Sequence, residues 1–183
     1  MTTGTGNTCI GRRSGESVTT GDNNTLLGYQ AGGNGTFRTG SNSMMLGLLA
    51  YPSSNSVSNE ITLGNSSIST LRCNQTSISS LSDGRDKIDV VDLPAGLEFL
   101  NTLRPVKFKW QRREPDINDG MIRAGFIAQD LQSAQANHNY LDLVMDNNPD
   151  KLEAKQGNLI PVLVQSIKEL SAEVEQLKSQ LNN

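Results

Sequence analysis

The stretch Ser82-Asp83-Gly84-Arg85-Asp86-Lys87 divides the 183-residue chain into two parts of different character. Residues 1–79 hold 12 of the 17 glycines and carry a formal charge of +1, from four arginines and three acidic residues. Because the net charge of the whole chain is −3, the remaining residues carry −4. Asp-Gly is a strong tight-turn dipeptide, so this stretch predicts a turn that folds Lys87 back towards Ser82 or towards a neighbouring chain. We therefore expect two domains, residues 1–81 and residues 82–183.

A degenerate repeat runs through the first part. Asn7-Thr8-Cys9-Ile10-Gly11 recurs 17 residues later as Asn24-Thr25-Leu26-Leu27-Gly28, and a looser pair at 42–47 and 59–64 is again 17 residues apart. Short apolar stretches that end on glycine predict short strands. Repeats of this length must stack or wind around partner chains to bury a face. We expect a trimeric β-fibre stalk of intertwined or stacked short strands, with a flexible Gly/Ser linker as the alternative.

The same part is poor in large apolar residues. Ordering its backbone costs roughly 1–2 kcal/mol per residue, which so thin a core does not offset by itself. We therefore expect residues 1–79 to be disordered or stabilised by other chains. Residues 65–81 predict an extended connection. Cys9 and Cys73 are expected to be free thiols of a protein made in a reducing cytoplasm.

Charge and hydropathy argue against two classes of partner. Neither part has a basic stripe, so nucleic acid is not an expected partner. No apolar run reaches 18 residues and the start has no signal-peptide pattern, so no membrane insertion is expected. Nothing in the sequence indicates a metal ion or another cofactor. Catalysis on sugars is not expected either, because the first part holds only three acidic residues, Glu16, Asp22 and Glu60.

Residues 82–183 predict a small α+β domain. Apolar periodicity and capping residues indicate, in order, a strand over 87–91, a helix from Asp92 as N-cap to about Leu103, a hairpin of strands 106–110 and 121–127, a helix over 128–136 and a short strand over 141–145.

The chain ends in a predicted helix over about 158–183, with Asn158 as its cap and Pro161 in its first turn. Heptad spacing predicts a coiled-coil seam; an amphipathic helix that packs on its own domain is the alternative. β-Branched residues at a with Leu at d favour two strands, although three heptads decide the number of strands weakly beside a trimeric stalk. The seam residues are Ile160, Leu163, Ile167, Leu170, Val174, Leu177 and Leu181.

The turn also carries potential chemistry. A serine hydroxyl attacks a carbonyl only if a base takes its proton, and the one histidine, His138, lies 56 residues downstream in an expected solvated loop. A lysine can serve when burial lowers its pKa, and Ser–Lys pairs are a known form of serine nucleophile. Taken alone, the stretch is better interpreted as a polar turn without chemistry, and only the resemblance described next favours the catalytic interpretation.

The second part resembles the self-cleaving C-terminal intramolecular chaperone domain of phage endosialidase tailspikes, long tail fibres and neck appendages. That family has a signature similar to Ser-Asp-x-Arg-x-Lys-x-x-Ile, although its final hydrophobic residue is shifted here to Ile88 and Val90/Val91. Later blocks match in order at 97–106, 125–131 and 159–170, so the resemblance spans 82–183. The signature positions are Ser82, Asp83, Arg85 and Lys87.

The resemblance implies a homotrimer in which Ser82 acts as nucleophile and Lys87 as general base. Asp83 and Gly84 would form the turn, and Arg85 would position a carbonyl, pair with a carboxylate or stay a plain surface charge. We place the cut at Leu81–Ser82, because attack on the preceding carbonyl closes a five-membered ring. A cut at Ser82–Asp83 remains open if a second chain supplies the attacking group.

The same resemblance implies a place in a virus particle. Three chaperone domains would bring the stalk strands into register in the host cytoplasm and then detach. Residues 1–81 would remain in the tail fibre of the virion and contact a host-cell receptor, for which a glycan is expected. The alternative is a structural trimeric adhesin tip that never cuts itself.

Overall fold

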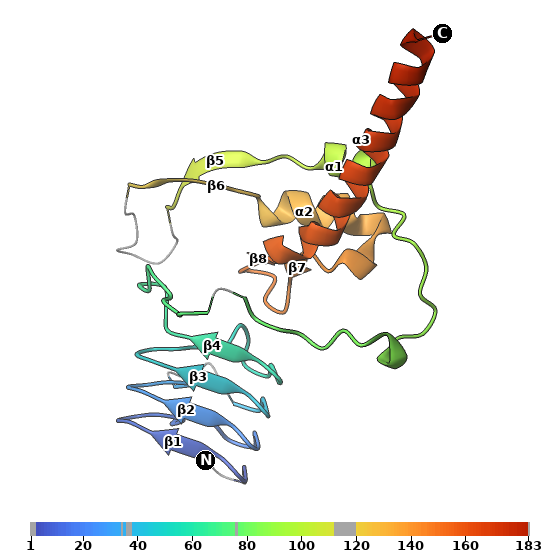
Figure 1. Cartoon of the computed structure of the whole chain (residues 1–183). Helices are drawn as coiled ribbons and strands as arrows, with labels where there is room; N and C mark the ends of the chain where they lie inside the picture. Colours follow the sequence, from blue (N-terminus) through green and yellow to red (C-terminus); the bar gives the residue numbers. More distant parts are fainter. Residues whose placement is uncertain (1–2, 34, 36–37, 76, 112–119, 183) are drawn as a thin grey trace. The chain divides into compact units, whose positions relative to one another are not determined.

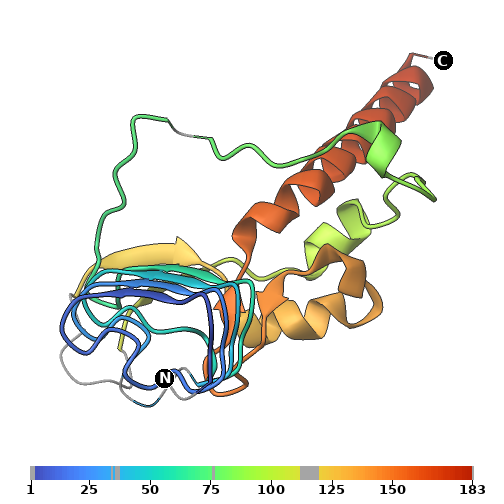
Figure 2. The ribbon, with the colours of Figure 1, turned by 90° about the horizontal axis from the view of Figure 1, so that it is seen from below.

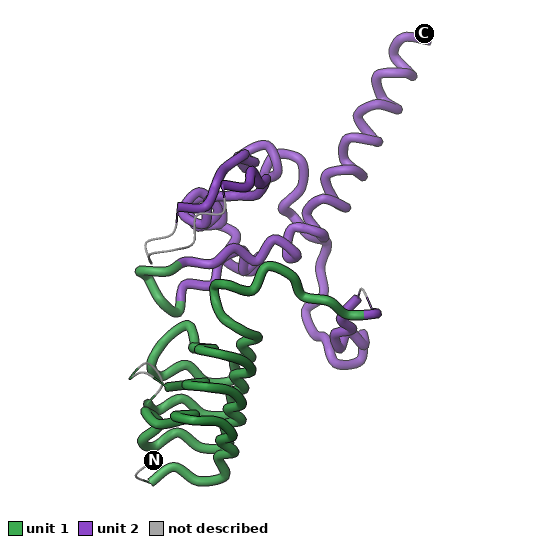
Figure 3. Tube along the Cα trace, turned by 90° about the vertical axis from the view of Figure 1, so that its left-hand side faces the viewer, with its two compact units in different colours: residues 1–73, 112–117, 147–151 green, residues 74–111, 118–146, 152–183 purple. Residues whose placement is uncertain are grey.

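The structure, a computed structural model, describes residues 3–33, 35, 38–75, 77–111 and 120–182. The chain separates into two compact units (Figure 3). The first is built mainly from residues 1–73, and the second from residues 74–111, 118–146 and 152–183.

Four short parallel strands make up the sheet of the first unit: β1 (Thr8–Ile10), β2 (Thr25–Leu27), β3 (Met44–Leu46) and β4 (Ile61–Leu63). They pair in sequence order, with Thr8 opposite Thr25, Thr25 opposite Met44, and Met44 opposite Ile61. Each repeat is therefore one coil of the chain, and the coils lie over one another (Figures 1 and 2). The predicted short strands are confirmed, and they stack within a single chain.

The middle residue of each strand points into the coil. Leu26 and Met45 are fully buried there, beside Val18, Ala31 and Ala50. From its sequence, this part was expected to bury too little surface without other chains. That expectation was wrong, because coil stacking supplies a small core and backbone hydrogen bonds within one chain, such as the one from the Thr8 N–H to the Asn24 carbonyl at 2.8 Å.

Polar side chains fix the register of neighbouring coils. The buried Asn24 is the centre of one ladder: its N–H donates to Asn7 Oδ1 and its own Oδ1 accepts from the N–H of Ser43, each at 3.0 Å. Ser43 Oγ in turn accepts from the N–H of Glu60 at 3.3 Å. The ladder joins all four coils because each repeat places an oxygen-bearing side chain at the same point.

The glycine that closes each strand is required by the close approach of the next coil. Gly11 has φ 124° and Gly28 has φ 131°, both in the region that favours glycine. A Cβ on Gly11 would also lie 2.6 Å from the carbonyl oxygen of Gly28. The repeat pattern thus reflects both backbone conformation and packing distance.

The second unit begins with extended chain and a single 3₁₀ turn, η1 (Gly84–Asp86). The predicted strand over 87–91 is wrong. No strand pairs with these residues in the described part of the chain, and Ile88, Val90 and Val91 have exposed side chains. Their β-branched composition favours extended backbone, but a strand also needs a partner edge.

Helix α1 (Leu97–Thr102) begins later than predicted. Asp92 is not its cap; Gly96 takes the N-cap position and offers no side chain. The carboxylate of Glu169, from the terminal helix, accepts the Leu97 N–H at 2.6 Å instead. This cap could not be predicted from local sequence, because its acceptor lies 72 residues away in the chain.

The predicted hairpin and second helix are confirmed as β5 (Val106–Lys109), antiparallel to β6 (Ile122–Gly125), and as α2 (Ala128–Ala134) with a 3₁₀ extension, η2 (Gln135–Asn137). The predicted strand over 141–145 is only partly present. The 3₁₀ turn η3 (Asn139–Leu141) and a left-handed Asp142 (φ 48°) precede β7 (Val144–Met145), which pairs with β8 (Glu153–Ala154).

The terminal helix α3 (Ile160–Leu181) follows a 3₁₀ turn, η4 (Gln156–Leu159). Asn158 is not its N-cap, because the Asn158 amide donates instead to the carbonyls of Leu141 and Asp142. Val162 of α3 is buried in the core of this unit together with Phe99, Leu131 and Leu143. Small sheets with a long terminal helix agree with the α+β expectation.

Candidate functional site

The carboxylate of Asp83 holds the predicted turn together. Its Oδ1 accepts the N–H of Arg85 at 2.9 Å. The Arg85 guanidinium also donates hydrogen bonds to both carboxylate oxygens, with Nη2 at 2.6 Å from Oδ2. The side-chain and backbone hydrogen bonds from Arg85 lower the pKa of the Asp83 carboxyl, and the same pairing raises the pKa of Arg85. Arg85 is thus paired with the carboxylate two residues before it.

The turn brings Ser82 and Lys87 into contact. The Lys87 N–H donates to the Gly84 carbonyl at 3.3 Å, which reverses the chain direction. Lys87 Nζ then lies 2.7 Å from Ser82 Oγ. The two residues proposed as nucleophile and base are therefore in hydrogen-bond contact, whereas their chemical roles stay predictions.

Water surrounds this pair in the single chain. Ser82 and Lys87 are exposed, and the neighbouring Leu81 is 100% exposed. An ammonium group that donates to Oγ has no capacity to accept the hydroxyl proton. The arrangement has the contact that base catalysis needs, and a drier environment would be needed to favour the neutral amine.

His138 is not the solvated loop residue that the sequence analysis expected. Its ring is half-buried and packs edge-on against Phe99 with centroids 5.1 Å apart, and a 2.8 Å hydrogen bond joins its Nδ1 and the Tyr140 hydroxyl. Its described partners are thus structural ones within the second unit.

The predicted seam of α3 faces solvent. Its seven residues are between 41% and 86% exposed, from Val174 to Leu181, whereas Val162 and Ser166 on another face are buried. The helix thus packs on its own domain with one face and leaves a separate apolar stripe uncovered. The coiled coil itself stays a prediction.

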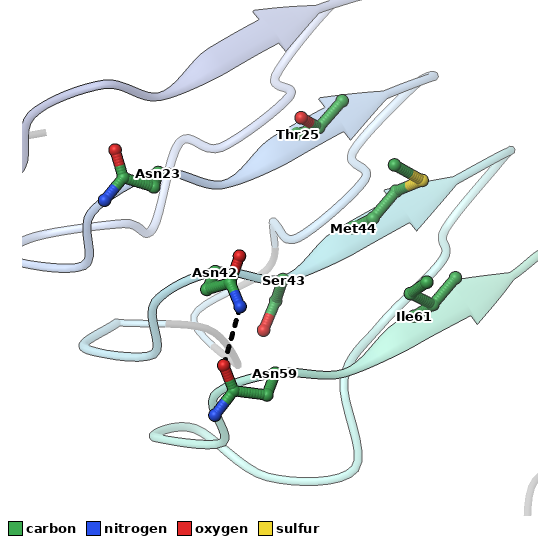
Figure 4. Close-up of a pocket in the computed structure, with 7 residues that line it drawn as sticks. All are labelled: Asn23, Thr25, Asn42, Ser43, Met44, Asn59 and Ile61. Carbon is green, nitrogen blue, oxygen red and sulfur yellow. Dashed lines mark hydrogen bonds between the residues drawn. The ribbon is translucent and has the colours of Figure 1, made fainter. Parts of the chain in front are cut away.

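A groove of about 260 Å³ lies on the sheet of the first unit (Figure 4). Asn42 donates its side-chain amide to Asn59 Oδ1 at 2.7 Å along one side. None of the lining residues is charged; they are Asn23, Thr25, Asn42, Ser43, Met44, Asn59 and Ile61. The sequence analysis did not identify this stack of asparagines, although the repeated Asn before each strand was its signal.

None of the helices in the described residues is long and apolar enough to cross a membrane. No group of three His, Cys, Asp or Glu side chains in the same residues is placed to hold a metal ion.

The model of a peptidase family described as "Chaperone of endosialidase" matches residues 82–140. No curated protein and no solved structure matches the chain. The match begins at the nucleophile candidate Ser82 and covers the turn, α1, the hairpin and α2. Residues 82–140 therefore belong to an endosialidase-type chaperone domain.

Proposed function

We propose that this chain is the C-terminal part of a phage tail fibre or tailspike whose chaperone domain drives trimerisation and then removes itself by cutting the Leu81–Ser82 bond. The observation that carries the proposal is the 2.7 Å contact between Lys87 Nζ and Ser82 Oγ. It occurs at the first residue of the family match, where the extended connection meets the chaperone domain.

The cutting step is an N-to-O acyl shift followed by hydrolysis. Neutral Lys87 takes the hydroxyl proton of Ser82 while Oγ attacks the carbonyl carbon of Leu81, which closes a five-membered ring. The carbon–nitrogen bond then breaks, the nitrogen takes the proton from Lys87, and an ester joins Leu81 to Oγ. Water hydrolyses this ester, which leaves a carboxylate on Leu81 and a free amine on Ser82.

Assembly supplies the condition that the single chain lacks. The pair is exposed in one chain, and covering it with neighbouring chains would favour the neutral amine of Lys87. The uncovered apolar stripe of α3 supports association of that kind, because aliphatic side chains at heptad spacing pack against one another in coiled coils. Cleavage would then follow correct assembly and make it irreversible.

The released product would be a stalk of residues 1–81 in the virion tail. Its coiled repeats are the part that would meet a host-cell surface, and a glycan receptor is our proposal for it. The domain boundary at residue 82, with the chaperone domain running to residue 183, belongs to the same proposal.

A denaturing gel of purified protein tests the proposal. Wild type should run as two fragments, 1–81 and 82–183, and Ser82→Ala as one intact chain. If wild type and Ser82→Ala both stay intact after prolonged incubation, the alternative of a non-cleaving adhesin tip replaces the protease. Mixing Ser82→Ala with Lys87→Ala subunits then tells whether one chain holds both groups, since cleavage in the mixture requires a site shared between chains.

A further inference from the structure

The outer face of the sheet in the first unit carries an unbroken aliphatic column. The third residue of each strand points outward, and the pairing of the strands sets these residues one above another. Ile10 is 59% exposed, Leu27 46% and Leu63 52%, so most of the column stands in water. The column consists of Ile10, Leu27, Leu46 and Leu63.

The strand positions beside the column are uncharged. The first residues of the same strands, which share this face, are Thr8, Thr25, Met44 and Ile61. The groove beside them is lined by amides, a hydroxyl and aliphatic groups. Uncharged strand positions meet those of an identical copy without like-charge repulsion, which opposes self-association of charged faces.

Aromatic side chains are missing from these eight strand positions. Sugar-binding surfaces stack their ligands on aromatic rings, whereas aliphatic columns bury against other aliphatic groups. The chemistry of the face therefore fits a protein surface better than a glycan.

We propose that this aliphatic column is the surface through which copies of this chain pack against one another along the stalk, column to column. The occupant is a second copy because its column repeats with the same residues in the same axial order, so identical columns match along their whole length. The proposal rests on the proposed trimeric function, and it names the contact that holds the stalk after the chaperone domain has gone.

A second uncovered stripe in the same chain supports this choice of occupant. The seam of α3, in the other unit, is also aliphatic and exposed. Another copy of the chain would cover both stripes. Helices with aliphatic residues at heptad spacing associate with one another as coiled coils. An unrelated partner would have to match two separate surfaces.

Cysteine cross-linking of the full chain tests the column directly. Leu27→Cys is placed in a Cys9→Ala, Cys73→Ser background, with and without Ser82→Ala, and treated with a short bismaleimide. Thr20→Cys in the same background is the matched control, because Thr20 is exposed and lies in the same unit outside the four strands. Leu27→Cys should lose its monomer band to cross-linked oligomers, before and after cleavage, and Thr20→Cys should keep it.

Cross-linking of both variants to the same extent, or of neither, would overturn the proposal. A second variant checks the same face without a cross-linker. Leu27→Glu should dissociate the cleaved 1–81 product into monomers in native mass spectrometry, whereas Thr20→Glu should leave it oligomeric; an oligomeric Leu27→Glu product contradicts the proposal. Cleavage is measured in the same samples on a denaturing gel. A chain that cleaves itself but whose Leu27→Cys variant is not cross-linked would contradict the packing of the columns and leave the proposed function standing.

Discussion

At the scale of single residues, the turn depends on one carboxylate that serves two groups. Asp83 accepts both the N–H and the guanidinium of Arg85, and this fixes the backbone from which Lys87 returns to Ser82. Exposed ion pairs contribute little to global stability. The Asp83–Arg85 ion pair acts locally here, because it restricts the conformation of a short segment that has few other contacts.

Replacing Lys87 with arginine separates charge from base chemistry. Arginine keeps the positive charge and the hydrogen-bond donor, but its guanidinium does not deprotonate in proteins. Lys87→Arg should therefore slow cleavage by at least ~10²-fold, the range expected for loss of a general base. The measurement is the rate at which full-length chain disappears, and a rate equal to wild type would contradict the role of Lys87.

At this scale the turn was predictable from sequence, but the side-chain contacts that hold it were not. Asp-Gly predicted the reversal, whereas the role of Arg85 stayed open because a surface charge and a clamp look alike in sequence. The structure shows which it is, because the Arg85 guanidinium contacts the carboxylate of Asp83. His138 was misplaced for a similar reason, since its neighbour Phe99 lies 39 residues earlier in the chain.

At the scale of elements, the stacked coils rest on buried polar contacts as much as on apolar ones. Asn24→Ala should destabilise the first unit by about 2–3 kcal/mol, because it leaves the buried N–H of Ser43 and the carbonyl of Gly40 without their partner. Asn74→Ala is the matched control: the same change at an exposed position outside the helices and strands should stay within about 0.5 kcal/mol of wild type.

Chemical denaturation in the Ser82→Ala background measures both changes. A loss for Asn24→Ala no greater than that for Asn74→Ala would show that the ladder does not set the stability of the coils.

The cap that α3 supplies to α1 gives a pH dependence. Hydrogen bonds from the Leu97 N–H and the Gln165 amide lower the pKa of Glu169. The stabilisation is therefore present above the unfolded-state pKa, about 4.3 for glutamate, and is lost as pH falls through the lowered folded pKa. Glu169→Gln, which resembles the protonated acid, should lower the melting temperature at pH 7.

At a pH below the lowered pKa, the melting temperatures of wild type and Glu169→Gln should converge. Thermal melts at both pH values in the Ser82→Ala background provide the measurement. An equal difference at neutral and low pH would assign the effect of the substitution to packing rather than to the carboxylate charge.

Elements with local signals were predicted from sequence, and elements with distant partners were not. The repeat predicted β1 to β4, the alternation of Val106 and Phe108 predicted β5, and the heptads predicted α3. The predictions of a strand over 87–91 and of a helix that begins after Asp92 were wrong, because both features depend on residues distant in the sequence. Residues 87–91 have no partner strand in the described part of the chain, and the cap of α1 is supplied by Glu169 of α3.

At the scale of the whole molecule, cleavage is proposed to depend on assembly of the chains. Leu177→Glu places a charge on the exposed seam of α3 without touching the turn, so it should slow cleavage by weakening association. Gln176→Glu, one residue earlier and off the seam, is the matched control and should cut at the wild-type rate. Cleavage time courses at several protein concentrations check this, and equal rates for both variants would uncouple cutting from the helix.

Intact-mass spectrometry of freshly folded wild-type protein, run beside Ser82→Ala, tests the central claim most directly. The account predicts two masses for wild type, corresponding to residues 1–81 and 82–183 with Ser82 as the new N-terminus, and one unbroken chain for Ser82→Ala. An unbroken wild-type chain, or a cut elsewhere that Ser82→Ala leaves unaffected, would contradict it.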